Sequence, residues 1–130
     1  TREIKNLISK DIIPVISPVG LDKNSQCLNI NADVVAGKVA ESLNAEKLIL
    51  LTDVKGITDD KGKLLSKISS VKANKILKNG IVKGGMVPKL IAAVKATKNG
   101  VSSSHIIDGR VPHAVMLEIL TAEGVGTLIS

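Results

Sequence analysis

"ADVVAGKVAESLNAEKLILLT", residues 32–52, places a helical pattern directly before a short apolar run. Val34, Val35 and Val39 begin an apolar stripe, and Asn31 or Asp33 would provide the N-cap of this helix. The run that follows, KLILLT, has the length of a buried strand rather than of a helix. A helix leading into a buried strand is the building unit of an α/β sheet. This stretch therefore predicts an α/β fold.

The rest of the chain repeats the alternation of strand-like runs and helical segments. The strand-like runs are residues 12–17 (IIPVIS), 47–52, 101–108 and 126–130, and the helical segments are 2–10, 32–43, 70–80, 86–100 and 112–120, with Pro112 in the first turn of the last. Residues 19–30 indicate a hairpin with a polar tip at 22–25, and 53–68 a loop with a small hairpin at 59–62. Strands separated by such helices predict one domain, residues 1–130, with a three-layer α/β/α architecture and a mostly parallel sheet.

Composition narrows the class of protein. The 130 residues are 44% hydrophobic and 23% charged, which is typical of a globular domain. No apolar run approaches the ~20 residues of a membrane span, and we expect neither a signal peptide nor a membrane partner. Cys27 is the single cysteine and cannot form an internal disulfide, which favours a reducing compartment, the cytoplasm or the plastid stroma. With only two histidines, we expect no Cys/His metal site.

The net charge and the lack of aromatic residues indicate which kind of partner the chain binds. A net charge of +6 suits an anionic partner, either nucleic acid or a phosphorylated small molecule. Phe, Tyr and Trp are absent, so the stacking platform of single-strand binders is missing and nucleic acid is the weaker alternative. We interpret the lack of aromatics as a simplified or engineered sequence, with a rare natural composition as the alternative.

Polar loops follow several of the expected strands. Open α/β sheets bind ligands at the carboxyl ends of their strands. Thr52 and Asp53 end one strand, and "HIIDGR" (105–110) places a polar turn at the end of another. In "GIVKGGMVPK" (80–89), two glycines precede a helix and Lys89 lies one turn in, so free N–H groups and an ammonium would form an anion site. Each loop alone also fits an ordinary turn or a solvated lysine.

The polar residues Asn29, Asn31 and Asp33 alternate in sequence. Alternation on an extended backbone directs side chains to one side, so the three could converge on one spot. The competing interpretation is a simple helix cap.

Five motifs together resemble the acetylglutamate kinases of the amino-acid kinase family: NINAD (29–33), KLILLTDVKGI (47–57), GGMVPK (84–89), HIIDGR (105–110) and LEILTAEGVGT (117–127). NINAD discriminates best, because relatives acting on aspartate, glutamate or UMP carry other residues there. The resemblance covers the whole chain and matches the carboxyl-terminal, nucleotide-binding half of such an enzyme.

The resemblance implies a role for particular residues. It assigns acetylglutamate binding to Asn29, orientation of catalytic lysines to Asp33 and stabilisation of the transferring phosphoryl group to Lys89. It assigns ATP contacts to two segments, comprising Asp53, Val54, Lys55, Gly56, Ile57 and Thr58, and then Ile81, Val82 and Lys83. ATP and Mg²⁺ are the implied cofactors. Phosphoryl transfer depends on positioning and charge neutralisation, which a lysine fixed by a carboxylate can supply.

The family also has parts that this sequence does not match. These are an amino-terminal lobe with a glycine-rich phosphate loop, a second catalytic lysine, a substrate-gripping arginine and much of the dimer interface. In arginine-inhibited members, residues matching His105, Glu118 and Gly126 help hold the inhibitor, but the helix that completes that site lies in the unmatched half.

Two function hypotheses follow. The first is the ATP-binding lobe of an acetylglutamate kinase, which phosphorylates the side-chain carboxylate of N-acetyl-L-glutamate in arginine biosynthesis. Its expected partners are a nucleotide, an amino-terminal substrate lobe and a second copy in a homo-oligomer. The second is a stand-alone nucleotide-binding domain without turnover.

Overall fold

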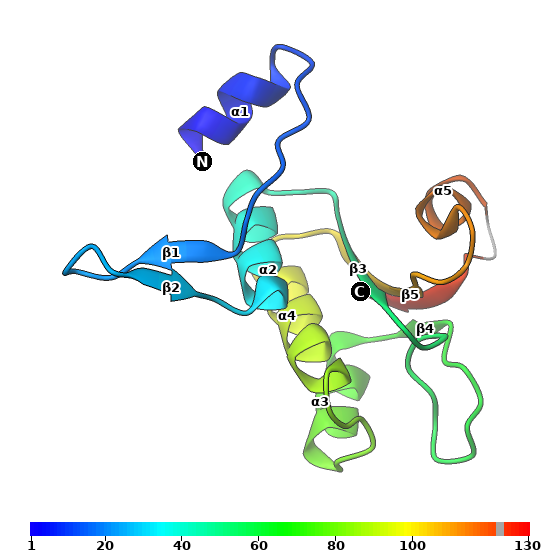
Figure 1. Cartoon of the computed structure of the whole chain (residues 1–130). Coiled ribbons are helices and arrows are strands. Elements are labelled where there is room, and N and C mark those ends of the chain that lie inside the picture. Colours follow the sequence, from blue (N-terminus) through cyan, green and yellow to red (C-terminus); the bar gives the residue numbers. More distant parts are fainter. Residues whose placement is uncertain (122–123) are drawn as a thin grey trace.

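The computed structural model describes residues 1–121 and 124–130, and Figure 1 shows the arrangement of its elements. The helices are α1 (Arg2–Ile8), α2 (Ala32–Leu43), α3 (Ser70–Lys78), α4 (Met86–Lys98) and α5 (Ala114–Leu120). The strands are β1 (Val19–Leu21), β2 (Cys27–Asn29), β3 (Lys47–Thr52), β4 (Lys67–Ile68), β5 (Ser103–Asp108) and β6 (Gly126–Ile129).

Four of the strands form the main sheet, in the order β3-β5-β6-β4. β3 and β5 are parallel over six residue pairs, from Lys47 opposite Ser103 to Thr52 opposite Asp108. β6 runs antiparallel to β5, and β4 is parallel to β6. The sheet is therefore mostly parallel, as the sequence predicts.

Helices cover both faces of this sheet. Along β5, Ser104 and Ile106 face α4, since the Ser104 hydroxyl donates to the Ala93 carbonyl and Ile106 joins the core beneath the helices. His105 faces the other way and bonds Glu118 of α5. Because neighbouring residues of a strand point to opposite faces, α2, α3 and α4 lie on one side and α5 on the other (Figure 1). This is the predicted α/β/α layering.

The core is aliphatic. Ile57, Leu90, Ile106 and Ile129 are among the largest fully buried side chains. α2 and α4 approach closely where Gly37 meets Ala92, since a Cβ at Gly37 would lie 3.6 Å from the Ala92 Cβ. Small residues at this contact let aliphatic side chains fill the core without aromatic rings.

Local signals in the sequence explain several boundaries. The Asn31 side chain accepts hydrogen bonds from the backbone N–H groups of Asp33 and Val34, so the predicted cap of α2 is Asn31. The expected hairpin at 19–30 is β1–β2, whose tip is closed by the Asp22 carboxylate accepting from Asn24 and Gln26. The small hairpin at 59–62 is closed by a bridge between Thr58 and Leu64.

Three sequence expectations are wrong in detail. Residues 12–17 form no strand. Pro14 lacks an N–H donor, and no described strand pairs with the segment. The last helix begins at Ala114 rather than at Pro112, because His113 adopts a left-handed φ of 59° that interrupts the helix. Within the expected loop 53–68, Lys67 and Ile68 form strand β4 through long-range pairing with β6.

The amino-terminal segment packs little. α1 contains no buried residue, and Ile13 and Val15 are 87% and 95% exposed. Figure 1 shows α1 standing apart from the layers that the main sheet and the other helices form. None of the described helices has the length and apolar character needed to cross a membrane.

One buried hydrogen bond ties the loop after β3 to β6. The backbone N–H of Ile57 donates to Thr127 Oγ1 at 2.9 Å, across 70 residues of sequence. Gly56 lies beside this bond with a φ of +131°, and a Cβ there would come within 2.8 Å of the same oxygen. The chain can therefore pass this point only with glycine at position 56.

Replacing Thr127 with Val should lower the free energy of unfolding by about 1–3 kcal/mol, because the buried Ile57 N–H loses its acceptor. Urea unfolding followed by circular dichroism measures the change. Thr127→Ser, which keeps the hydroxyl, is the control and should stay closer to the unmodified protein. Equal stability of the Val variant and the unmodified protein would contradict this role.

Candidate functional site

The candidate site lies where β3 and β5 end. Their parallel register brings Thr52 beside Asp108, so both following loops leave the sheet at the same edge. The N–H of Gly109 donates to the Thr52 carbonyl at 2.8 Å, which holds the two loops together. Polar groups far apart in sequence therefore meet at one edge of the sheet.

A cleft of about 340 Å³ opens at this edge. It is lined by Thr52, Asp53, Val54, Lys83, Gly85, Met86 and Lys89. These residues come from the end of β3 and the loop that follows it, from the loop before α4 and from the first turn of α4. Two lysines in one small cleft suit an anionic ligand.

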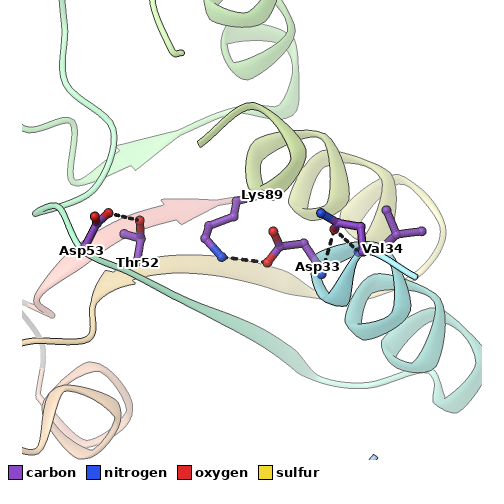
Figure 2. Close-up of polar contacts among 6 residues, drawn as sticks. Asp33, Val34, Thr52, Asp53 and Lys89 are labelled. Atoms are coloured by element: carbon purple, nitrogen blue, oxygen red, sulfur yellow. Dashed lines mark hydrogen bonds and ion pairs between the residues drawn. The ribbon is translucent and has the colours of Figure 1, made fainter. Parts of the chain in front are cut away.

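Lys89 is held in this cleft by an ion pair. Its ammonium lies 2.8 Å from Asp33 Oδ1, which joins α4 to the first turn of α2. The two side chains are only 21% and 14% exposed. Figure 2 shows the Lys89 side chain between Asp33 and the end of β3, where Thr52 Oγ1 donates to Asp53 Oδ1 at 3.4 Å. The carboxylate thus fixes the direction of the ammonium.

The start of α4 differs from the expectation of free backbone N–H groups. The N–H of Met86 donates to the Lys83 carbonyl and that of Val87 to the Gly84 carbonyl, at 3.3 and 3.2 Å. The next residue is Pro88, which has no N–H. The positive charge of the site therefore comes from the lysines more than from the helix terminus.

A second ion pair stiffens the loop after β5. The Arg110 guanidinium donates to both oxygens of Asp108, at 2.9 and 2.8 Å. These bonds, with one from the Arg110 backbone, lower the pKa of Asp108 to about 2. The Asp108 negative charge is therefore present and neutralised by Arg110 across the ordinary pH range.

The structure brings together some of the residues that the sequence suggested. Asp53, Val54 and Lys83 line the cleft with Lys89, and Asp33 contacts Lys89 directly. Met86 also lines it and was missed, although its place at the start of the helix after Gly85 was a usable signal.

Other suggested residues lie outside the cleft lining. Asn29 is exposed at the end of β2, and Lys55, Gly56, Ile57, Thr58, Ile81 and Val82 flank the cleft in sequence. The Ile57 side chain is buried in the core and Val82 packs against that core. Asn31 caps α2.

Two other hollows differ from this cleft in their lining. The larger, about 460 Å³, lies between residues 14–18, α2 and β3, and the residues that line it are all apolar, which does not suit a phosphate. The other, about 240 Å³, contains His105, Glu118 and Gly126. His105 Nδ1 lies 2.7 Å from Glu118 Oε1, while Oε2 accepts from the Val125 N–H, so both carboxylate oxygens already have partners.

The chain is similar to known proteins of one family. The model of the amino acid kinase family matches residues 1–108. Over all 130 residues the chain is 56% identical to acetylglutamate kinase of Alcanivorax borkumensis and 55% identical to that of Hydrogenovibrio crunogenus. It spans 44% of the length of each of these relatives.

Among solved structures, N-acetylglutamate synthase from Neisseria gonorrhoeae, complexed with coenzyme A and L-arginine, superposes with a TM-score of 0.92. The identity is 26%, over 99% of this chain and 30% of that one. Sequence and fold agree: the chain belongs to the amino acid kinase family.

Proposed function

We propose that this chain is the ATP-binding lobe of an acetylglutamate kinase. The full enzyme would transfer the γ-phosphoryl group of ATP to the side-chain carboxylate of N-acetyl-L-glutamate, a step of arginine biosynthesis in the cytoplasm. The observation that carries the proposal is the 2.8 Å pair of Lys89 and Asp33 beside a cleft at the carboxyl edge of the sheet. The names of the two bacterial relatives support the choice of substrate.

The cleft suits a triphosphate. Lys83 and Lys89 supply positive charge, and Gly85 has no side chain to obstruct the approach of a ligand. Val54 and Met86 add apolar surface, on which we place the base and sugar. Among the described residues, no cluster of three His, Cys, Asp or Glu side chains could bind a metal ion by itself. Mg²⁺ bound mainly by phosphates and water fits such a site.

The residues act by placing charge. Bound MgATP would supply the phosphoryl group and partly neutralise its charge. The Lys89 ammonium, held by Asp33, stabilises the negative charge that spreads over the phosphoryl oxygens. Since the ammonium is already oriented, little reorganisation is needed when the charge develops. We assign Asn29 to the acetylglutamate and the segments 53–58 and 81–83 to the nucleotide.

The acceptor side of the reaction requires a partner lobe. Because the chain spans 44% of its relatives, we assign the remaining phosphate and substrate contacts to an amino-terminal lobe. The relatives are kinases, so a domain that only binds nucleotide is not favoured.

Replacing Lys89 with Ala should weaken ATP binding roughly 10- to 100-fold, the usual range for losing a charge-assisted contact. Adenosine binding should change little, because it carries no phosphate. Isothermal titration calorimetry with and without Mg²⁺ measures both affinities. Lys38→Ala removes an exposed lysine that pairs with Glu41 outside the cleft. This variant is the matched control and should leave both affinities unchanged. Equal losses for ATP and adenosine would show that Lys89 is only structural.

The chain alone should turn over acetylglutamate far more slowly than the ~1–100 s⁻¹ of ordinary kinases. Loss of one preorganised donor costs about 10²–10³ in rate, and the proposal places at least two contributors in the other lobe. A coupled ADP-release assay, run on the chain alone and then with the amino-terminal lobe of a relative, measures this. Rates within the ordinary range from the chain alone would refute the division of roles.

A further inference from the structure

Positive charge is concentrated in one part of the chain. Residues 61–117 contain eleven of the eighteen lysines and arginines but only one of the twelve acidic residues, Asp108. Asp108 is itself neutralised by Arg110. The helices α3 and α4 lie within this segment, and all of their charged residues are positive.

The directions of the strands show at which edge of the sheet the two ends of α3 and of α4 lie. β4 runs opposite to β3 and β5, so its carboxyl end and the start of α3 lie at the edge away from the cleft. From there α3 runs back and ends with Lys75 and Lys78 in its last turn, shortly before Lys83 of the cleft. α4 begins in the cleft and runs the other way, ending with Lys95 and Lys98. Figure 1 shows α3 beside the first half of α4.

These two lysine pairs have the same local role but different places. Lysines in the last turn of a helix interact favourably with the partial negative charge of its carboxyl end. This interaction by itself explains why both pairs lie where they do. Lys95, however, has an acidic neighbour: the pKa of the Glu41 carboxyl is lowered mainly by its hydrogen bond from Lys38, and the nearby charge of Lys95 adds a smaller lowering. Among the described residues, neither Lys75 nor Lys78 forms an ion pair, and both are exposed. Their field therefore extends into solvent on the cleft side.

We propose that Lys75 and Lys78 form an electrostatic approach surface that guides a polyphosphate ligand into the cleft of Lys83 and Lys89, an inference that rests on the proposed ATP function. Along a helix, 1.5 Å per residue separates Lys89 from Lys95 by about 9 Å and from Lys98 by about 13 Å, both beyond the ~8 Å Debye length of physiological salt. Charges at the far end are therefore screened from the cleft, whereas those at the near end act on an incoming triphosphate.

Stopped-flow association of a ribose-labelled fluorescent ATP with the full chain tests this. At ~0.15 M ionic strength, where the Debye length is ~8 Å, the variant Lys75→Gln/Lys78→Gln should associate about three- to tenfold more slowly, which is at or below the lower end of the 10–10³ range of steering effects because only two charges are removed. The difference should shrink as salt is raised, and the dissociation rate should not change. Lys95→Gln/Lys98→Gln removes the same net charge from the equivalent turn of α4 and should associate like the unmodified protein. Labelled adenosine should show no difference among the three proteins.

Each other outcome has a definite meaning. Equal slowing by both double variants would show that only the net charge of the protein matters, and would overturn the proposal. An unchanged association rate for Lys75→Gln/Lys78→Gln would also overturn it. A faster dissociation instead of a slower association would make the lysines direct ligands and also overturn it. Failure of the unmodified protein to bind ATP would contradict the proposed function itself, whereas binding without the predicted salt dependence contradicts the approach surface alone.

Discussion

The parallel pairing of β3 with β5 is the constraint on which the rest of the structure depends. Six consecutive pairs fix which residues face each other, and the last of them sets Thr52 beside Asp108. Parallel strands need a long connection, and α3 and α4 lie within it, so α4 starts at the same edge. A cleft lined by the end of β3, the loop at 83–85 and the first turn of α4 is a direct consequence of this connectivity.

Close helix packing connects the core to the site. The absence of aromatic side chains leaves small and aliphatic residues to fill the space between the helices and the sheet. Gly37 lets α2 approach α4 at Ala92. The same pair of helices carries Asp33 and Lys89, so their approach also brings the carboxylate and the ammonium to 2.8 Å. Packing and charge placement are therefore linked. A Cβ at position 37 would still make ordinary van der Waals contact with Ala92, so only a side chain larger than that of alanine would disturb both.

Charged residues serve distinct purposes in this chain. The Asp108–Arg110 pair neutralises itself and fixes a turn, and the buried contact of His105 with Glu118 attaches α5 to the sheet. Lys89 is oriented by Asp33 but remains partly exposed to the cleft. These differences follow from surroundings rather than from residue type, since a carboxylate with all its bonds satisfied has little left to offer a ligand.

The sequence by itself determined most of the elements and their order. Periodicity gave the bounds of α2 and β3, Asn31 capped α2 as its position suggested, and residues 19–30 paired as a hairpin. Such features depend on interactions between residues close in sequence. The motifs, through the resemblance that they carry, likewise pointed to Asp33, Asp53, Lys83 and Lys89.

The features that depend on contacts between residues far apart in sequence were decided only by the tertiary structure. Strand β4 exists because β6 pairs with it, while the strand-like residues 12–17 have no described partner and stay irregular. Ile57, next to residues of the cleft in sequence, points into the core because Thr127 holds its backbone from 70 residues away. The distance between Asp33 and Lys89, 56 residues apart, likewise depends on how two helices pack. A local pattern cannot specify these contacts, because their energy comes from groups that only the folded chain brings together.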